Sequence, residues 1–418
     1  MKARSENYDA VIVGGGPAGA SAAIHLAARG ARVLVAEQKK FPRAKLCGEF
    51  ISPECLEHFK RLGVLESMTQ AGGTPLCETL FYSRRGASVS VPSAWFGTGQ
   101  SLALGLSRAE MDERLIRRAR AAGVVVLEEA HATSLLMEEG RVCGVRLRVA
   151  GEVREYTSRV AVDATGRARA LSRHVEADGR TRGKQAGKRT GKRAPLVAFK
   201  AHLEDTRVDP LHCEIYFYRG GYGGLSSVEG GRSNLCFIVS ARDARRYNGD
   251  AERMVREIVA TNRRAAWTLA PPARPVSEWL GVALDGFGRR EIVPADGLLA
   301  VGDAASFIDP FTGSGMLMAL ESGELAALAI TRWLELRHGG GRDESAPFDD
   351  LARAYRALYA ERFSRRLRVC SMLRRAAFVP RLAEAAILAL GPSERLRRRL
   401  ARSTRRPHTP FRGKGRAA

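Results

Sequence analysis

Short apolar runs and one alanine-rich stretch alternate in the N-terminal part of the chain. A β-branched run at Ala10–Val13 and a second apolar run at Arg32–Glu37 flank the alanine-rich residues Ala18–Arg29. Short apolar runs bounded by glycine or charge are typical of buried strands, and longer alanine-rich stretches are typical of helices. Residues 8–37 therefore predict one βαβ unit.

The pattern changes twice further along the chain. A helix is predicted at Leu106–Ala122, and strands are predicted at Val124–Leu127, Val142–Val149 and Val160–Val162. Apolar and polar residues alternate between Leu196 and Val239, which predicts an antiparallel sheet in a separate layer. From Leu317 to about residue 403 the pattern is mostly helical. No internal repeat is present.

These patterns, in a chain of 418 residues of which 45% are hydrophobic, predict an α/β protein with a large core. We expect a Rossmann-like nucleotide-binding domain, a second domain built on an antiparallel sheet that binds the substrate, and a C-terminal helical region. The nucleotide-binding domain takes residues 1–75, 105–177 and 285–345, and the substrate domain takes residues 76–104 and 195–284. The remainder is a basic loop at 178–194, helices at 346–403 and a basic tail at 404–418.

Cysteine usage and hydropathy indicate a cytoplasmic protein. The seven cysteines are scattered, odd in number and lack a Cys-x-x-Cys pair, which favours free thiols and argues against disulfides and a metal site. No signal peptide is expected, because a strand-like run begins at Tyr8. No apolar stretch approaches the roughly 20 residues that span a bilayer.

The formal net charge of +23 is concentrated in two segments. Residues 178–194 carry seven basic residues and one acid, and residues 395–418 carry ten basic residues and no acid. Neither run contains interleaved aromatics for base stacking, so no specific nucleic-acid partner is expected. We favour a solvated loop and tail, with weak peripheral membrane contact through the basic C-terminal helices as the alternative. The oligomeric state is left open.

The first glycine-rich segment is Tyr8-Asp-Ala-Val-Ile-Val-Gly-Gly-Gly-Pro-Ala-Gly19. Its glycines follow a strand and precede a helix, the context of a dinucleotide-binding fingerprint. Such a turn and helix N-terminus bind a pyrophosphate, and Glu37 stands where a carboxylate accepts hydrogen bonds from a ribose. An acid there disfavours a 2′-phosphate. The residues assigned to the dinucleotide from this region are Gly14, Gly16, Pro17, Ala18, Gly19, Glu37 and Gln38.

The second glycine-rich segment is Val301-Gly-Asp-Ala-Ala-Ser-Phe-Ile-Asp-Pro-Phe-Thr-Gly-Ser-Gly-Met316. An Asp after a short strand can bind ribityl hydroxyls, and the amides of a following helix can face a ring that gains negative charge. Alone, Asp303 has the simpler interpretation of a helix cap. Together with the distant fingerprint and the buried strand ending at Asp163-Ala-Thr-Gly166, a flavin explains it better.

At these residues the chain to about residue 345 resembles FAD enzymes of the p-hydroxybenzoate hydroxylase fold. It is most similar to the geranylgeranyl reductase family, whose relatives include flavin-dependent halogenases and FAD monooxygenases. Two further segments carry this resemblance, Phe41-Pro-Arg-Ala-Lys-Leu-Cys-Gly-Glu49 and Leu106-Ser-Arg-Ala-Glu-Met-Asp112. The resemblance implies an FAD cofactor, and the residues it adds to the FAD site are Arg43, Cys47, Gly48, Arg108, Asp163, Gly166, Gly302, Asp303, Pro310, Gly313, Ser314, Gly315 and Met316.

The resemblance also implies individual roles. Arg43 and Arg108 would contact FAD, Asp303 would bind its ribityl chain, and residues 310–316 would lie beside the ring. Cys47 occupies the place where reductases of this family carry a cysteine close to the active site. It is therefore a candidate catalytic or gating thiol, with a small buried residue free of chemistry as the equal alternative.

Two departures from the family pattern narrow the function. The turn Asp163-Ala-Thr-Gly166 replaces the Asp-Gly turn of the hydroxylases, which makes an ordinary aromatic hydroxylase less favoured. In Gly221-Tyr-Gly-Gly-Leu-Ser-Ser227, Tyr222 remains but the family's tryptophan and proline are absent, so halogenation is not expected. The substrate pocket should be apolar and wider than the pocket of those families. Tyr222 either orients a substrate or donates a proton, or it only packs in the sheet.

The function predicted from these observations is FAD-dependent reduction or oxidation of carbon–carbon bonds in an apolar small molecule, isoprenoid or polyketide-like, by hydride transfer at flavin N5. The alternative is an FAD-dependent monooxygenase. A peripheral membrane or interaction protein and an inactive flavin-binding relative are further alternatives. No second nucleotide fingerprint is present, so NAD(P)H is expected to bind transiently. His131, His202 and His212 lack motif context and are interpreted as structural.

Overall fold

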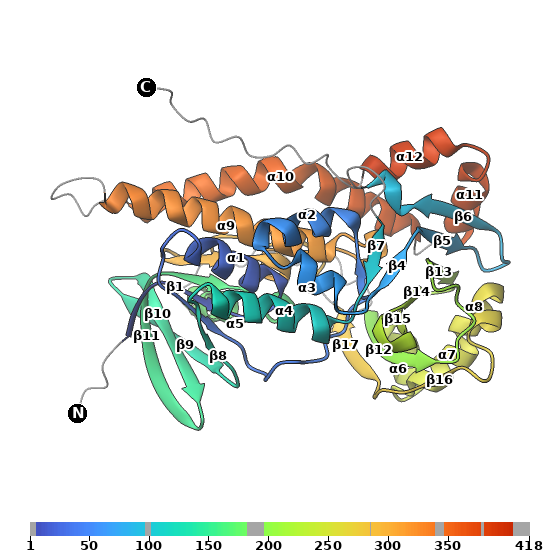
Figure 1. Ribbon diagram of the computed structural model, residues 1–418, viewed down its shortest axis with the longest axis horizontal. Coiled ribbons are helices and arrows are strands. Elements are labelled where there is room, and N and C mark those ends of the chain that lie inside the picture. The colour runs from blue at the N-terminus through green and yellow to red at the C-terminus, as the bar shows by residue number, and fades with distance from the viewer. Residues whose placement is uncertain are drawn as a thin grey trace.

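The computed structural model describes residues 6–96, 102–181, 196–284, 286–338, 347–377 and 380–403. Within these ranges two large sheets lie beside each other, with helices packed on both (Figure 1). Most of the basic run at 178–194 and the tail at 404–418 lie outside the described residues. Residues 178–181, expected at the start of a loop, belong to the end of helix α5 (Ala170–Thr181).

The first sheet has the strand order β8-β2-β1-β11-β10-β9, and β19 pairs with β11. Its strands are β1 (Glu6–Val13), β2 (Val33–Ala36), β8 (Val125–Leu127), β9 (His131–Glu138), β10 (Arg141–Val149), β11 (Glu152–Asp163) and β19 (Leu298–Ala300). The pairs joining β8, β2, β1, β11 and β19 are parallel, whereas β9, β10 and β11 form an antiparallel ribbon. β11 is long because its first half belongs to the ribbon and its second half to the parallel sheet.

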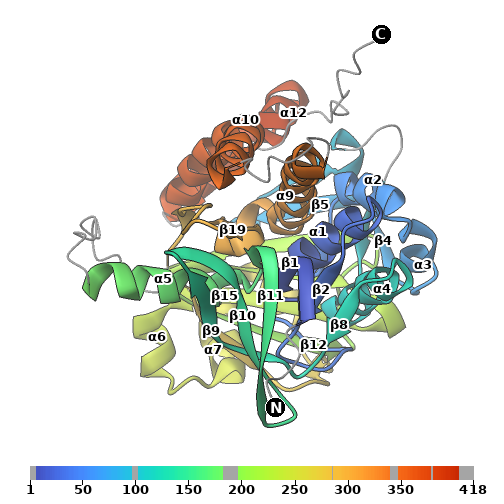
Figure 2. The ribbon, with the colours of Figure 1, turned by 90° about the vertical axis from the view of Figure 1, so that its left-hand side faces the viewer.

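Three segments far apart in sequence meet at one edge of this sheet. Strands β1, β11 and β19 are parallel neighbours, with Val13 opposite Asp163 and Asp163 opposite Ala300. The carboxyl ends of parallel strands lie at the same edge, where ligands of open α/β sheets bind. Figure 2 shows these three strands beside one another. The turns that follow them therefore lie at one edge of the sheet.

Helices α1 (Pro17–Ala27) and α9 (Gly315–His338) pack closely because both present small residues. A Cβ on Gly323 would lie 2.3 Å from the Ala18 carbonyl oxygen, so no larger residue fits that position without displacement. The Ser21 hydroxyl donates to the Leu320 carbonyl oxygen at 2.8 Å. This contact joins the N-terminal βαβ unit to the segment that follows residue 300.

The second sheet has the order β16-β12-β15-β14-β13-β5-β6, and β17 pairs with β12. Its strands are β5 (Glu78–Tyr82), β6 (Ser88–Pro92), β12 (Leu196–Glu204), β13 (His212–Tyr218), β14 (Gly221–Ser227), β15 (Ser233–Ser240), β16 (Arg274–Pro275) and β17 (Leu280–Leu284). The alternation between residues 196 and 239 correctly predicted antiparallel strands there. One pair, β5 with β13, is parallel, and β5 comes from an earlier part of the chain.

The two faces of this sheet have different partners. One face packs in a core with α6 (Ala241–Arg246), α7 (Ala251–Glu257) and α8 (Arg263–Thr268). The other face carries Tyr222, Ile238 and Phe217 and lies toward the first sheet and helix α11 (Pro380–Leu390). The period-two geometry of strands thus sends one set of side chains to the core and the other set to the space between the domains.

Long helices complete the chain as predicted. Helix α10 (Phe348–Ala377) packs on α9, and α11 and α12 (Glu394–Ser403) follow at the end of the molecule that carries β5 and β6 (Figure 1). Buried Glu321 of α9 pairs with Arg366 of α10 at 2.8 Å and also with Arg362. Among the described residues no helix is long and apolar enough to cross a membrane.

The remaining elements are short or cover the first sheet. Helices α2 (Pro53–Leu62), α3 (Leu65–Thr69) and α4 (Arg108–Ala121) contribute buried side chains to the same core as α1 and α9. Three short strands form a small sheet, β3 (Phe50–Ile51), β4 (Thr74–Leu76) and β7 (Ala103–Gly105), and two form a ribbon, β18 (Gly288–Arg289) with β20 (Ser306–Phe307).

Candidate functional site

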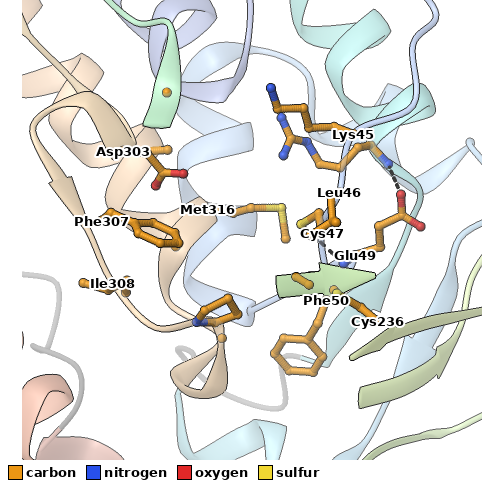
Figure 3. Close-up of a pocket in the computed structure, with 18 of the residues that line it drawn as sticks. Lys45, Leu46, Cys47, Glu49, Phe50, Cys236, Asp303, Phe307, Ile308 and Met316 are labelled. Carbon is orange, nitrogen blue, oxygen red and sulfur yellow. Dashed lines mark hydrogen bonds between the residues drawn. The ribbon is translucent and has the colours of Figure 1, made fainter. Parts of the chain in front are cut away.

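One continuous cavity of about 530 Å³ extends from the glycine turn after β1 to helices α11 and α12. Charged and apolar side chains line different parts of it. The charged side chains of Glu37, Arg43, Lys45, Arg108, Arg167 and Asp303 lie toward the glycine turns, and Phe81, Val89, Ile215, Phe217, Ile238, Leu284 and Ile387 lie toward the second sheet and α11. Figure 3 shows Asp303 on one side of the cavity, facing the segment with Lys45 and Cys47.

The turn after β1 has the geometry that its glycines predict. Gly14 has φ +110°, and a Cβ there would lie 2.2 Å from the Ala164 carbonyl oxygen. A Cβ on Gly19 would lie 1.9 Å from the Gly14 carbonyl oxygen. Only glycine satisfies these two positions, so the turn and the start of α1 can approach β11 closely.

Gly16 differs from the other two glycines because its Cβ position is open to the cavity. The nearest atoms to that position are guanidinium nitrogens of Arg108 and Arg43, at 3.7 and 3.9 Å. The free amides at the start of α1 and its helix dipole point to the same place. The turn therefore forms an anion site with two arginines beside it.

Carboxylates hold both arginines in place. Arg43 donates to Asp112 and to Glu37, each at 3.0 Å, and Arg108 donates twice to Asp112, at 2.9 and 2.8 Å. Burial disfavours the charge on Arg108, but Asp112 outweighs burial and raises the pKa of this guanidinium above its ordinary value. These carboxylates preorganise both guanidinium groups toward the cavity.

Lys45 and Arg167 add positive charge that the sequence analysis did not assign. Both line the cavity, and among the described residues no ion pair or hydrogen bond reaches the Lys45 ammonium group. Burial, together with neighbouring Arg108 and Arg43, lowers the pKa of Lys45. An anion bound among these cations would remove that repulsion. Lys45 lies within the segment 41–49 that carries the family resemblance, so its position was available as a signal.

Asp303 lies two residues after Val301, whose amide donates to the Asp163 carbonyl oxygen at 3.0 Å. The Asp303 carboxylate faces the cavity, and no hydrogen bond or ion pair with another described residue satisfies it. Burial raises its pKa despite the opposing charges of Arg167, Arg108 and Lys45. A half-buried acceptor that faces a cavity without a donor fits a ligand that brings hydroxyl groups.

Taken together, the cavity fits FAD. The cations around Gly16 match a pyrophosphate, and Asp303 supplies an acceptor where a ribityl chain would bring donors. The Glu37 carboxylate already accepts hydrogen bonds within the protein, from the Gly15 amide at 2.9 Å and from Arg43. These bonds hold its carboxylate at the cavity wall beside Gln38.

Most residues assigned to the site from the sequence line this cavity, and three do not. The lining includes Gly14, Gly16, Pro17, Ala18, Glu37, Gln38, Arg43, Cys47, Gly48, Arg108, Gly166, Tyr222, Gly302, Asp303, Pro310, Gly313, Gly315 and Met316. Gly19, Asp163 and Ser314 are absent from it. The carboxylate of Asp163 instead accepts from Thr165 and Ser172, so it fixes the turn that carries Ala164 to Gly166.

A buried charge cluster that the sequence analysis missed borders the same cavity. The Glu49 carboxylate accepts from the Lys200 ammonium group at 2.5 Å, from the His202 Nε2 at 2.7 Å and from the Arg108 amide at 2.9 Å. Burial opposes ionisation of Glu49, but His202 and Lys200 outweigh it and lower its pKa. Glu49 has φ +52°, a strained conformation for a non-glycine residue, which these bonds stabilise.

The cluster joins the segment around Glu49 to the second sheet. Lys200 and His202 lie two residues apart on β12, so they share the face of the second sheet that looks toward Glu49. The expectation that His202 is structural agrees with this pairing. His212 contacts Glu78 and Asp209. His131 lines the cavity.

Two thiols face the cavity near this cluster. The Cys47 thiol accepts weakly from the Glu49 amide at 3.5 Å, and the Cys47 carbonyl oxygen accepts from Asn234 at 3.1 Å. Cys236 of β15 also lines the cavity, and burial raises its pKa to about 12 (Figure 3). Cys47 is thus partly accessible from the cavity, as a catalytic or gating thiol requires, while Cys236 is expected to stay protonated.

Tyr222 lies where the second sheet meets the loop after β20. Its hydroxyl donates to the Asp309 carboxylate, which also pairs with Arg374 of α10 at 3.1 Å. Its ring contacts Phe311 edge-on, with 5.6 Å between centroids. Burial and the Asp309 charge raise the pKa of Tyr222 well above its ordinary value, and burial raises the pKa of Asp309. Tyr222 and Asp309 together can hold a proton beside the loop 310–316.

Replacing Asp303 with asparagine is expected to weaken FAD binding about 10- to 100-fold, because hydrogen bonds to a charged acceptor contribute roughly 1.5–3 kcal/mol. The same change should raise the melting temperature of the flavin-free protein at pH 7. A carboxyl whose folded-state pKa is raised stabilises the fold below its ordinary value of 3.8 and loses that contribution as the pH rises through the folded-state pKa. Flavin fluorescence titration and thermal unfolding measure the two effects.

Asp349 offers a matched control, since it is an exposed aspartate in the first turn of α10. Asp349→Asn should leave FAD affinity unchanged. Unchanged affinity in Asp303→Asn would show that the carboxylate does not bind the cofactor.

Comparison with known proteins supports this assignment of the cavity. Residues 7–330 match the protein-family model described as FAD binding domain. The chain is 31% identical over 330 residues to digeranylgeranylglycerophospholipid reductase 2 of Methanopyrus kandleri, with 77% of this chain and 78% of that protein covered. It is 28% identical over 391 residues to menaquinone reductase of Mycolicibacterium smegmatis, with coverage of 87% and 84%.

The fold is also found among solved structures. A geranylgeranyl bacteriochlorophyll reductase-like protein from Thermoplasma acidophilum superimposes with a TM-score of 0.75 at 20% sequence identity, covering 96% of each chain. At this identity the likeness concerns the fold alone.

Proposed function

The chain belongs to the FAD-binding domain family, among its geranylgeranyl reductase-like oxidoreductases, and we propose that it reduces carbon–carbon double bonds of an apolar, isoprenoid or polyketide-like molecule. That it is an FAD-dependent oxidoreductase follows from the family. The substrate class and the direction of the reaction form the proposal.

One observation carries the proposal: the cofactor part and the apolar part belong to a single cavity. Cations and Asp303 surround its inner end, and mostly aliphatic and aromatic side chains line the rest, with Arg397 at the outer border. An apolar pocket with few convergent polar groups suits a hydrocarbon substrate. A polar substrate would leave its own groups without partners in the outer part.

Strand β14 supports a wide pocket. Gly224 and Ser226 line the cavity on the same face as Tyr222, at positions where the resembling families carry bulky aromatics. A Cβ on Gly224 would lie 3.1 Å from Ile215 Cδ1, so a large side chain there would have to displace Ile215. The small residues leave room for a substituted or branched chain.

FAD, when bound, supplies the two-electron carrier that exchanges a hydride with a substrate carbon. The residues of this chain provide the proton and exclude water. In this proposal Tyr222 would deliver a proton to the neighbouring carbon and Asp309 would return one to Tyr222; the hydrogen bond between the two side chains and the raised pKa of Asp309 support it. The cluster around Glu49 fixes the segment that carries Cys47 against the second sheet.

The named relatives favour a lipid substrate. One is named as a reductase of a digeranylgeranyl glycerophospholipid and another as a reductase of menaquinone. Both compounds carry long unsaturated isoprenoid chains. The absence of a second nucleotide fingerprint suggests that NAD(P)H, or another donor, binds only transiently.

Anaerobic mixing of the chemically reduced flavoprotein with candidate substrates tests the proposal. A geranylgeranyl lipid without a quinone ring is expected to reoxidise the flavin and to gain two hydrogen atoms at carbon, whereas a fully saturated lipid should do neither. Flavin absorbance and product mass measure the two events.

The monooxygenase alternative gives a different result in the same experiment. A product heavier by one oxygen atom, formed only when oxygen is admitted, would replace the reductase proposal. No flavin reoxidation with any unsaturated lipid, in protein that binds FAD, would also contradict it.

A further inference from the structure

Helices α11 and α12 form the outer border of the cavity. From α11, Ala383, Ala386, Ile387 and Leu390 line it, and from α12, Arg397, Leu400 and Ala401 do so. Arg397 also donates to the Ser90 carbonyl oxygen of β6 at 3.3 Å. These two helices therefore form one wall of the cavity.

The outer side of α11 is unusually apolar for a helix at a protein surface. Leu382 is 53% exposed and Leu388 is 62% exposed, and Ala385 and Ala389 are exposed as well. The charge on Glu384 faces Arg85 at 3.8 Å. A helix that is apolar toward the core and also toward the outside normally has a second apolar partner.

Helix α12 presents a different outer surface. Arg395, Arg398, Arg399 and Arg402 are all exposed and follow a spacing of three, one and three residues, which places them on one face. This basic stripe lies opposite the face of α12 that lines the cavity. No ion pair with another described residue neutralises any of the four, and Leu396 beside them is 49% exposed.

We propose that the outer surface of α11 and α12 docks on an anionic lipid bilayer, so that a lipid passes from the bilayer into the cavity between these helices. The apolar side of α11 would enter the interfacial region, and the basic stripe of α12 would contact lipid headgroups. Interfacial segments combine these two features, apolar insertion with flanking basic residues. The passage of lipid rests on the proposed function, whereas the docking does not.

Charge and continuity favour a bilayer over other occupants. A second copy of the chain would bring its own four arginines against this stripe, and like charges at close range repel. A nucleic acid could bind the stripe but has no use for Leu382 and Leu388. Only a lipid surface uses the apolar helix, the basic helix and the adjoining apolar cavity together.

Vesicle flotation of the full-length flavoprotein tests the docking without turnover. Vesicles of phosphatidylcholine with phosphatidylglycerol are expected to bind the protein, and vesicles of phosphatidylcholine alone should bind it at least about tenfold less. Leu382→Ser/Leu388→Ser and Arg398→Glu/Arg399→Glu should each weaken binding to the anionic vesicles at least about tenfold, since each basic residue near such a surface contributes roughly fivefold. Raised salt should weaken the arginine-dependent part.

Two control variants have matched chemistry elsewhere. Leu336, in the last turn of α9, is 68% exposed, and Arg242 and Arg245 are exposed on α6. Leu336→Ser and Arg242→Glu/Arg245→Glu should bind vesicles as the parent protein does. Equal losses in the control variants would overturn the proposal, because binding would then depend on bulk charge or hydrophobicity.

A second measurement separates docking from chemistry. The four variants should retain flavin and should reduce a short, detergent-dispersed substrate at the parent rate, but the α11 and α12 variants should lose turnover of lipid embedded in anionic vesicles at least about tenfold. If no substrate is turned over while vesicle binding is intact, the proposed function is refuted and docking remains supported.

If the parent protein does not bind vesicles, docking is refuted. A different outcome is that the parent protein binds no vesicles but self-associates in light scattering, and that the α11 variant abolishes this self-association. That outcome would assign the surface to a second copy of the chain instead.

Discussion

Replacing Tyr222 with phenylalanine is expected to lower kcat at least about a hundredfold while folding and flavin binding are retained. Proton transfer by a positioned side chain contributes roughly 10²–10⁴-fold to a rate, and Tyr222 is the cavity residue whose hydroxyl is held by a carboxylate with a raised pKa. The ring, which packs against Phe311, would remain. KM should change little, because the phenol is proposed to act on the reacting carbon and not on binding.

Single-turnover oxidation of the reduced flavin by an unsaturated lipid measures this effect directly. The solvent deuterium isotope effect should also change, since proton delivery would pass to water. A purely structural role would instead lower stability and leave the isotope effect and its pH profile unaltered. Tyr218→Phe is the matched control, because Tyr218 is equally buried on the neighbouring strand but donates to the Ile238 carbonyl oxygen.

The cofactor end of the cavity could be predicted from sequence because its determinants are local. Gly14 and Gly16 sit in one turn between a strand and a helix, and Asp303 follows directly after another strand. Spacing within a βαβ unit fixes such geometry. The role of Asp163 was not predictable in the same way, because its partners Thr165 and Ser172 satisfy it locally and keep it out of the cavity.

The junction between the domains could not be predicted from the same signals. Glu49 meets Lys200 and His202 across 151 and 153 residues of sequence, and nothing in the spacing of either segment identifies the other. Lys200 and His202 share a face of β12 because residues two apart on a strand point to the same side. Which face looks toward the cavity depends on how the two sheets pack, and this is a property of the tertiary structure.

The outer border of the cavity shows the same limit. The arginine-rich helices were recognisable in the sequence, and both a solvated and an interfacial role were consistent with their composition. The structure adds that α11 and α12 line the apolar cavity with one side and expose Leu382 and Leu388 on the other. Composition alone cannot supply that relation, because it depends on where the helices pack.

Replacing Glu49 with glutamine is expected to lower the free energy of unfolding at pH 7 by about 3–5 kcal/mol, because removing one partner of a buried charge cluster leaves the other charges uncompensated. The Lys200 ammonium group would then be buried without its carboxylate. Lys200→Met in the same chain should restore part of the loss, since it removes the unpaired charge. Urea unfolding followed by tryptophan fluorescence and by flavin release measures the stability.

The pH dependence identifies the cause of that loss. The pKa of Glu49 in the folded protein is lowered below its ordinary value of 4.5, so its contribution to stability is present above pH 4.5 and is lost as the pH falls through the folded-state pKa. The stability difference between the parent and Glu49→Gln should therefore shrink below pH 4.5. Glu155→Gln is the control, because Glu155 forms an exposed ion pair with Arg146, and its loss should cost no more than about 1 kcal/mol. An equally small effect for Glu49→Gln, with no pH dependence, would mean that the cluster does not hold the two domains together.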